Sequence, residues 1–325
     1  MRLEEIKLDI ESQLSKIITE DYVLYDIPNH KNIGDQLIYQ GELDFLKTLP
    51  YKCCDYSSVT FNFSRKIQPN TILLHGGGNF GDLYPLHQNF REKTIKNNPD
   101  KKIVIFSQTV HFESKKELER SAKVFNAHRN VTLCARDTVS FDILRKHFIN
   151  CKVILLSDMA LCSSYSKSKK PKYEVLIMKR KDIELGGINV LKNSYGYPEI
   201  DWPTYEESMV ESIVSFYVKL NNKFSKLYFR SVQKNSVFGL LPIRNKDSYI
   251  KQGIDFLSDY KFVISTRLHG HILCLLLGIP SVIINNSYGK NKRFYNSWLK
   301  NVDNSYYAET IEEGIELYRN FQNEK

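Results

Sequence analysis

The amino-acid sequence predicts an α/β protein made of two open halves, each built on a parallel sheet. Strand-like apolar runs alternate with amphipathic helical segments over nearly the whole chain, as they do in stacked β-α-β units. Several of these runs are apolar on both faces, which is typical of parallel strands covered by helices. The chain has 325 residues, more than one core of ordinary size needs, so we expect two domains.

The expected elements follow one another along the chain. Six strands are expected before a Ser/Lys-rich break, at residues 22–27, 51–56, 71–76, 102–108, 131–136 and 152–158. Four more are expected after it, at residues 173–180, 226–231, 262–266 and 281–286. Amphipathic helices are expected over residues 1–14, 35–49, 115–128, 204–222 and 308–322. The break itself, residues 163–172, predicts a boundary between domains of residues 1–165 and 166–325.

The net charge of +9 indicates an anionic partner. Nucleic acid is not expected, because the charge is spread along the chain and no nucleic-acid-binding motif is present. An anionic small substrate fits the charge, and so does peripheral contact with the inner face of the cell membrane. We interpret the densest basic stretch, residues 167–172, as a solvated linker.

The hydrophobic pattern and the cysteines bear on the compartment and on metal binding. No apolar run reaches the roughly 18–20 residues that span a bilayer, and the charged N-terminal segment lacks the apolar core of a signal peptide. A cytoplasmic location is therefore expected. The six cysteines form no CxxC pair and have no histidine at zinc-binding spacing. We expect reduced thiols, no metal site and no bound cofactor.

Unusual polar clusters come directly after the expected strands. They are Asn32–Asp35, Gly76–Asp82, Gln108–His111, Arg136–Asp137, Asp158, Arg180, Arg267–His271 and Asn286–Lys290. In open parallel sheets, ligands bind at the carboxyl ends of the strands, where helix N-termini also point. The sequence therefore predicts that these clusters line one enzyme-like cleft between the two halves.

The glycine cluster is open to several interpretations. Gly76, Gly78 and Gly81 have the G-x-G-x-x-G spacing of a dinucleotide-binding turn, but the next strand ends in Ser-Gln where that motif needs an acidic residue. A P-loop would need Lys in place of Asp82, and a lipase-type oxyanion turn would need a G-x-S-x-G elbow that the chain lacks. Two possibilities stay open: a turn that exposes its backbone to a ligand, and a tight strand-to-helix turn without one.

Arg267 and His269 are the leading candidates for the centre of the site. The planar fork of Arg suits a phosphate or a carboxylate, and His carries protons near neutral pH. An isolated Arg-x-His also fits a buried structural histidine, and His271 fits a packed position. Asp35 is either a carboxylate of the site or the N-cap of the helix that follows.

Taken together, these motifs resemble the polysaccharide pyruvyltransferase family, in particular its branch from bacterial exopolysaccharide and capsule gene clusters. The resemblance covers about residues 30–300 and rests on nine phrases in the family's order: NIGDQLIYQGE, HGGGNFGDLYPLHQNFRE, KIVIFSQTVHF, ARDTVSFDIL, SDMAL, RKDIE, DWP, RLHGHILCLLLGIP and NNSYGKNKRFYNSWL. It implies a GT-B-like architecture, with two Rossmann-like domains facing across a cleft. It also implies an enzyme that moves the pyruvyl group of phosphoenolpyruvate onto a pair of sugar hydroxyls, giving a cyclic pyruvate ketal.

The resemblance places the donor near Arg136, Arg267, Leu268 and His269, and our own interpretation of the motifs and of the chemistry adds roles for other residues. The expected catalytic residues are His269, as the acid that protonates the donor, Arg267, and Asp35, as a base or a sugar-binding carboxylate. The expected donor-binding residues are Arg136, Arg267, Leu268, His269, Gly77, Gly78, Asn79 and Lys290. The expected acceptor-binding residues are Asn32, Gly34, Asp35, Asp82, Gln108, His111, Asp158 and Arg180.

Two positions depart from the family pattern, and two other functions stay open. Thr266 precedes the Arg-Leu-His motif and Asn285 precedes the Asn-Ser-Tyr-Gly-Lys motif, each where Asp is usual. These changes bear on the acceptor, which is expected to be a sugar or a lipid-linked oligosaccharide. The other functions are a GT-B glycosyltransferase using a nucleotide sugar and a non-catalytic sugar-binding subunit of a polysaccharide assembly complex. The sequence does not indicate an oligomeric state.

Overall fold

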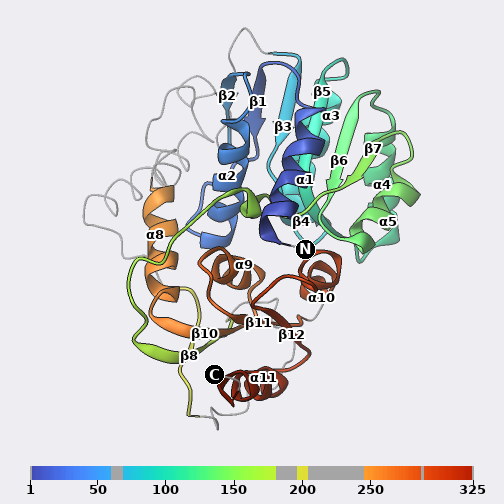
Figure 1. Cartoon of the computed structure of the whole chain (residues 1–325). Coiled ribbons are helices and arrows are strands. Elements are labelled where there is room, and N and C mark those ends of the chain that lie inside the picture. The colour runs from blue at the N-terminus through green and yellow to red at the C-terminus, as the bar shows by residue number, and fades with distance from the viewer. Residues whose placement is uncertain (1, 60–68, 181–195, 204–244, 287–288, 324–325) are drawn as a thin grey trace, which may run out of the picture.

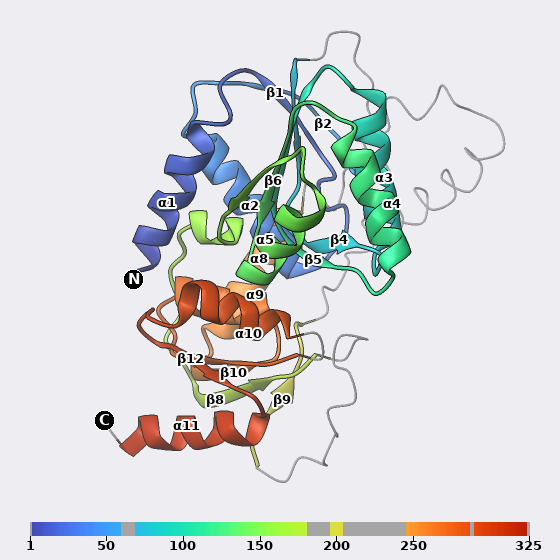
Figure 2. The same ribbon diagram turned by 90° about the vertical axis from the view of Figure 1, so that its right-hand side faces the viewer.

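Two parallel β-sheets form the frame of the protein (Figure 1). The computed structural model describes residues 2–59, 69–180, 196–203, 245–286 and 289–323. Within these ranges each sheet has helices on both of its faces (Figure 2), which confirms the predicted α/β class. The expected helix 204–222 and strand 226–231 lie outside the described residues, as do residues 181–184 and 287–288 of two motif phrases.

The larger sheet has the strand order β2-β1-β3-β5-β6-β7, with β4 paired to β5. Its strands are β1 (Tyr22–Tyr25), β2 (Cys53–Tyr56), β3 (Thr71–Leu74), β4 (Gly77–Gly81), β5 (Lys102–His111), β6 (Val131–Ala135) and β7 (Lys152–Leu155). Helices α1 (Leu3–Ser15) and α2 (Ile33–Leu46) cover one face, and α3 (Pro85–Asn97) and α4 (Lys115–Asn126) cover the other (Figure 2). Helix α5 (Thr138–His147) follows β6, and the short helix η1 (Met159–Cys162) follows β7.

The smaller sheet has the strand order β12-β11-β10-β8-β9. Its strands are β8 (Tyr173–Met178), β9 (Glu199–Ile200), β10 (Tyr260–Ser265), β11 (Ser281–Ile284) and β12 (Ser305–Ala308). Helices α9 (Leu268–Leu276) and α10 (Lys290–Phe294) lie between the two sheets, whereas α11 (Ile311–Asn323) covers the far face (Figures 1 and 2). Helix α8 (Lys246–Leu257) and the π-helical turn η5 (Tyr295–Leu299) complete this half.

Contacts between helices join the two halves. Helix α2 packs against α8 and α9, and η1 packs against α9. The indole nitrogen of Trp298 donates to the carbonyl of Arg136 over 2.8 Å, and the backbone of Thr138 donates to the hydroxyl of Ser297 over 3.2 Å. One apolar core, which includes Leu37 and Leu273, therefore runs across the junction. The strands of the larger sheet precede the boundary predicted at residues 165 and 166, and those of the smaller sheet follow it. The domain boundary itself stays a prediction.

The glycine segment differs most from the expectation. The sequence predicts a turn, either one that exposes its backbone to a ligand or a tight strand-to-helix turn, but residues 77–81 form strand β4, and β5 continues to His111 to pair with it. The backbone explains the glycines: Gly77 and Gly81 have φ angles of +131° and +130°, and a Cβ on Gly81 would lie 1.7 Å from the carbonyl oxygen of His111. A side chain is excluded there, because the two backbones are in direct contact.

Other elements begin or end a few residues from their expected limits. The closing helix begins at Ile311 rather than 308, because residues 305–308 add β12 to the sheet edge. Asn32, not Asp35, caps α2, since its side-chain oxygen accepts from the backbone nitrogen of Gly34 over 2.9 Å. The alternative interpretation of Asp35 as the N-cap is therefore wrong, and Asp35 lies in the first helical turn.

The contact at Gly81 predicts a large loss of stability when a methyl group is added. Gly81→Ala is expected to lower the free energy of unfolding by about 3 kcal/mol, because both the positive φ and the contact with His111 are violated. Gly278→Ala is the matched control, since Gly278 has a φ of +64° and a Cβ added there would meet nothing within 4 Å beyond its chain neighbours. It is expected to cost about 1 kcal/mol. Denaturant unfolding of both variants tests this, and equal losses would contradict it.

Candidate active site

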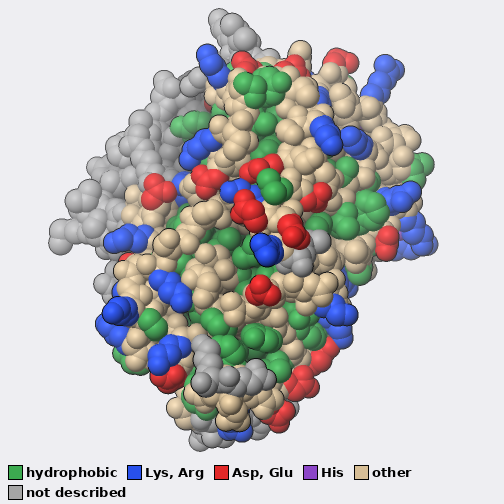
Figure 3. All heavy atoms as spheres, in the orientation of Figure 1, with side chains coloured by type: hydrophobic (Ala, Val, Ile, Leu, Met, Phe, Trp, Pro, Cys, Tyr) green, Lys and Arg blue, Asp and Glu red, His purple; other side chains and the backbone are tan. Residues whose placement is uncertain are grey.

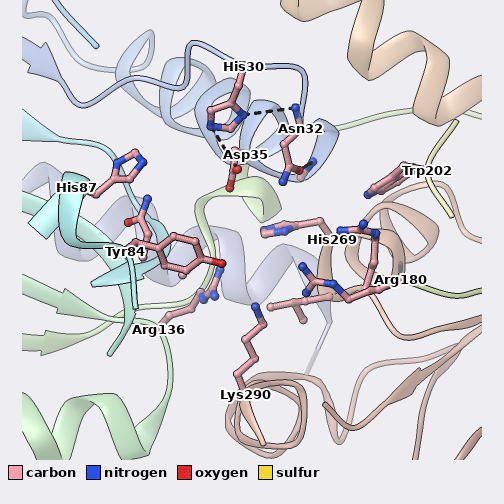
Figure 4. Close-up of a pocket in the computed structure, with 15 residues that line it drawn as sticks. His30, Asn32, Asp35, Tyr84, His87, Arg136, Arg180, Trp202, His269 and Lys290 are labelled. Atoms are coloured by element: carbon pink, nitrogen blue, oxygen red, sulfur yellow. Dashed lines mark hydrogen bonds and ion pairs between the residues drawn. The ribbon is translucent and has the colours of Figure 1, made fainter. Parts of the chain in front are cut away.

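Fifteen residues from both halves line one cavity of about 300 Å³ (Figure 4). This volume lies at the lower end of the range of small-molecule sites, about 300–1,000 Å³. The lining consists of His30, Asn32, Gly34, Asp35, Gly78, Asn79, Tyr84, His87, Arg136, Arg180, Trp202, Arg267, Leu268, His269 and Lys290. Figure 4 shows the labelled side chains around the cavity, with those of the larger sheet facing those of the smaller. Polar residues that follow β1, β6, β8, β10 and β11 therefore meet at one place, as parallel-sheet topology predicts.

Arg136 lies at the base of the cavity and is almost fully buried. Its Nη1 donates to Asp158 Oδ2 over 2.7 Å, while Nε and Nη2 donate to Thr109 Oγ1 over 3.0 and 2.8 Å. Its guanidinium also lies 6.0 Å from the ring centre of Phe294 in α10. These contacts fix the orientation of a permanent cation at the carboxyl end of β6.

His269 shares the carboxylate that holds Arg136. Its Nε2 lies 3.2 Å from Asp158 Oδ2, and Asp158 Oδ1 accepts from the backbone nitrogen of Ala160 over 2.9 Å. Burial alone raises the pKa of the Asp158 carboxyl, but His269 and then Arg136 outweigh burial and hold this pKa well below its usual range. Asp158 is therefore a permanent negative charge between two groups of the cavity.

Gly34 makes room for the imidazole of His269. A Cβ on Gly34 would lie 2.7 Å from Nδ1 and 3.0 Å from Cγ of that ring. The first turn of α2, in the larger half, therefore packs directly against the first turn of α9, in the smaller half. Asp35, the next residue of α2, lies in the cavity with its Oδ2 3.6 Å from Nε2 of His30.

Arg267 presents a second cation from the smaller half. Its Nε and Nη2 make a two-point contact with the carboxylate of Asp201, with Nη2 2.8 Å from Oδ2. Its backbone nitrogen donates to Ser265 Oγ over 3.1 Å, and the same hydroxyl donates to the Arg267 carbonyl over 2.9 Å. Arg180 lies beside it, held by its backbone nitrogen, which donates to Thr266 Oγ1 over 2.9 Å.

Two buried acidic groups hold the glycine segment and the start of α3. Glu42 accepts from the backbone nitrogen of Gly76 and contacts Nδ1 of His75, each over 2.8 Å. Asp26 contacts Nδ1 of His87 over 2.8 Å and pairs with Arg91 over 2.7 Å. Arg91 in turn donates to the carbonyl of Asn79 over 3.0 Å. Buried contacts of Asp26 and Arg91 thus hold Asn79 and His87 in position at the cavity.

Five of the residues predicted for the site lie outside the lining: Gly77, Asp82, Gln108, His111 and Asp158. Asp82 accepts from the backbone nitrogens of Glu113 and Ser114, where it orders the start of α4. Gln108 is buried and donates to the carbonyl of His75, and His111 ends β5. The predicted acceptor contacts of Asp82, Gln108, His111 and Asp158 find no support in these positions.

Four lining residues were not predicted as site residues: His30, Tyr84, His87 and Trp202. Tyr84, His87 and Trp202 lie in phrases that carry the family resemblance, yet no single-residue chemistry marked them. Tyr84 and His87 flank Pro85, the first residue of α3, directly after the glycine segment. One signal would have identified Tyr84 and His87. It is the presence of an aromatic residue and a histidine at the start of a helix that follows a glycine-rich strand.

Permanent positive charge dominates the cavity lining. It includes Arg136, Arg180, Arg267 and Lys290 against one carboxylate, Asp35, and the N-termini of α2 and α9 also face it. Away from the cavity, Lys and Arg are scattered over the face in Figure 3, and acidic side chains gather where the halves meet. Among the residues that the structure describes, no three His, Cys, Asp or Glu side chains are grouped to hold a metal ion. Nor does any described helix have the length and hydropathy to cross a membrane.

The fold and this cavity define an α/β protein with a cation-lined cleft suited to an anionic small molecule. Comparison with known proteins identifies the family: the chain belongs to the polysaccharide pyruvyl transferase family, which matches residues 32–288. This confirms the predicted resemblance, and the family implies transferase activity directed at polysaccharide.

Relatives agree with this assignment, and a solved structure has a similar fold. The chain is 33% identical over 303 residues to the putative pyruvyl transferase EpsO of Bacillus subtilis, covering 91% of this chain and 89% of that protein. It is 28% identical over 306 residues to pyruvyl transferase 1 of Schizosaccharomyces pombe, covering 85% and 69%. An uncharacterized protein from Klebsiella pneumoniae has a similar fold, with a TM-score of 0.57 at 21% identity over 94% of this chain and 99% of that one.

His271 is a structural residue with a predictable effect on stability. It is fully buried between Ser281 Oγ at 2.8 Å and Ser305 Oγ at 3.0 Å, and burial lowers its pKa from 6.5 to about 3. The folded protein keeps His271 neutral while the unfolded chain takes up a proton below pH 6.5. Its contribution to stability is therefore complete above pH 6.5 and falls by about 1.4 kcal/mol per pH unit as the pH drops toward 3.

His271→Gln is expected to remove this dependence while keeping one polar contact. Thermal unfolding of both proteins at pH 7.5 and at pH 5 tests it. Wild type is expected to lose more stability on acidification than the variant. Parallel losses in the two proteins would show that His271 is not held neutral in the fold.

Proposed function

We propose that the protein transfers the pyruvyl group of phosphoenolpyruvate to a sugar of an exopolysaccharide or capsule precursor, forming a pyruvate ketal. The observation that carries the proposal is the meeting of Arg136, Arg267, Lys290 and His269 around one cavity. Phosphoenolpyruvate carries a phosphate and a carboxylate, so its site needs two regions of positive charge and a proton donor. The family membership of the chain supports the same reaction class.

The donor is proposed to lie between Arg136 and Arg267. Arg136 comes from the larger half and Arg267 from the smaller, so one ligand with two anionic ends spans both. Lys290 and the backbone at Gly78 line the cavity beside Arg136. A Cβ on Gly78 would lie 3.2 Å from Nη2 of Arg136. The absence of a side chain lets a ligand reach the guanidinium there. We also propose that the two halves act as the two domains of a GT-B-like enzyme.

The proposed reaction begins at the donor methylene carbon. His269 delivers a proton to that carbon, which becomes a methyl group and leaves an oxocarbenium-like centre at the neighbouring carbon. A sugar hydroxyl attacks this centre, and Asp35 accepts the hydroxyl proton. The bond to the phosphate oxygen breaks, a second sugar hydroxyl closes the ketal ring, and its proton leaves with the phosphate. The proton on Asp35 then restores His269, so that donor and diol give ketal and inorganic phosphate.

The acceptor is proposed to enter on the side of His30, Asp35 and Tyr84. Asn32 and Gly34 lie at the same helix start, and Arg180 and Trp202 face them across the cavity (Figure 4). Tyr84 is 37% exposed, so part of its ring is open to an approaching sugar. A lipid-linked acceptor would bring the protein to the inner face of the cell membrane.

Ligand binding separates this proposal from a nucleotide-sugar glycosyltransferase. Phosphoenolpyruvate at about 100 times its dissociation constant is expected to add about 2.7 kcal/mol to stability, which raises the midpoint of thermal unfolding by about 4 °C. Arg267→Ala is expected to abolish this shift, whereas Arg129→Ala, at an exposed arginine outside the lining, keeps it. Shifts with UDP-, GDP- or CMP-sugars and none with phosphoenolpyruvate would instead support a glycosyltransferase.

The contact between Gly34 and His269 predicts a loss of turnover without a loss of fold. In Gly34→Ala the new methyl group displaces the imidazole, so kcat is expected to fall at least about tenfold, within the range that a misplaced general acid costs. His269→Ala is expected to lower kcat by about 10²–10⁴-fold. Release of inorganic phosphate in the presence of acceptor measures both. Near-normal turnover of His269→Ala would remove this residue from the mechanism.

A further inference from the structure

Asp158 contacts two residues of the site but does not itself line the cavity. It is about 1% exposed and does not line the cavity, so a sugar does not reach it. One oxygen accepts from the backbone nitrogen of Ala160, which fixes the carboxylate at the start of η1. The other oxygen contacts both Arg136, at 2.7 Å, and His269, at 3.2 Å. These two residues belong to different halves of the molecule and, in the proposed function, to different steps.

We infer that Asp158 is a positioning residue that couples donor binding to proton delivery, because a single carboxylate oxygen holds both the donor-binding Arg136 and the acid His269. This inference rests on the proposed function. A buried carboxylate beside an imidazole fixes which ring nitrogen points toward it. With Nε2 directed to Asp158 and the Nδ1 side packed over Gly34, the ring has one orientation.

The shared oxygen makes the two contacts interdependent. When an anionic donor binds Arg136, it competes with Asp158 for the guanidinium. The contact between Asp158 and His269 then remains and holds the imidazole in position while it delivers its proton. Asp158 itself stays ionised throughout, and the proton passes only from His269 to the donor carbon.

The other charged groups around His269 do not provide this link. Asp35 lies in the first turn of α2, and Arg180, Arg267 and Lys290 line the cavity. The three cations disfavour a charged imidazole, and Asp35 is paired with His30 at 3.6 Å. In the described part of the chain, Asp158 is the carboxylate for which the structure gives a contact with His269 below 4 Å.

Asp158→Asn keeps the shape of the side chain and removes its charge. Relative to wild type, kcat is expected to fall about 100-fold and KM for phosphoenolpyruvate to rise about tenfold. The loss in kcat follows from the contact with His269 and the rise in KM from the contact with Arg136. A purely structural role would lower the yield of folded enzyme without changing kcat and KM of the folded fraction.

Two further variants separate the two contacts. Thr109→Val removes the other hydrogen-bond partner of Arg136 and leaves both contacts of Asp158 in place, so it is expected to raise KM without lowering kcat. Asp55→Asn, at a buried carboxylate of β2 outside the cavity lining, is expected to leave KM and kcat as in wild type. If Thr109→Val lowered kcat as much as Asp158→Asn does, any loosening of Arg136 would suffice and Asp158 would have no special role.

The decisive experiment is a double-mutant cycle in kcat with Asp158→Asn and His269→Ala, with wild type in the same assay. If Asp158 acts through His269, the double variant is expected to be no slower than His269→Ala alone. Multiplied losses would overturn the inference. Absence of turnover with phosphoenolpyruvate in wild type would instead count against the proposed function.

A readout without turnover is the ¹⁵N chemical shift of Nε2 of His269, measured at one pH in wild type and in Asp158→Asn. We expect this chemical shift to differ between the two proteins, because the variant loses the contact of Nε2 with a carboxylate. Superimposable spectra would overturn the inference whether or not the enzyme turns over.

Discussion

The carboxylate of Asp158 connects the ends of three strands and both halves of the molecule. Arg136 follows β6, Asp158 follows β7, and His269 lies in the helix that follows β10. A buried ion costs several kcal/mol of desolvation unless its partners surround it. Each of these three groups is therefore stable in place only while the others are present. At this point ionic contacts, in addition to apolar packing, fix the position of one sheet relative to the other.

Glycines give the backbone the close approach that this charge cluster needs. Gly41 in α2 has no room for a Cβ, which would lie 1.8 Å from the carbonyl oxygen of Met159. Helix α2 thus lies directly on η1, whose N-cap is Asp158. Earlier in the same helix, Gly34 lies on the ring of His269. The two glycines lie about two turns apart on one face of α2, so this face positions both the carboxylate and the imidazole.

The sequence predicted the class of fold and most of the cavity, and the exceptions have physical causes. Residues at strand ends, such as Arg136 and Arg267, were predictable because parallel topology gathers them at one edge. Asp82, Gln108 and His111 also follow apolar runs, but β4 and the extended β5 take up that region, and only the close approach at Gly81 reveals it. Asp158 was predicted as a site residue, but its contacts with Arg136 and His269 were not, because no spacing in the sequence indicates that residues 136, 158 and 269 meet.

The measurement that tests the proposed chemistry most directly is the reaction run in deuterium oxide with phosphoenolpyruvate and a sugar acceptor. We expect a ketal whose methyl group carries one deuterium, with inorganic phosphate formed in equal amount, because the donor methylene takes one proton from an exchangeable group. Proton and phosphorus nuclear magnetic resonance measure both products. Product formation that required a nucleotide sugar, or a pyruvyl methyl group without deuterium, would contradict proton delivery to phosphoenolpyruvate in this cavity.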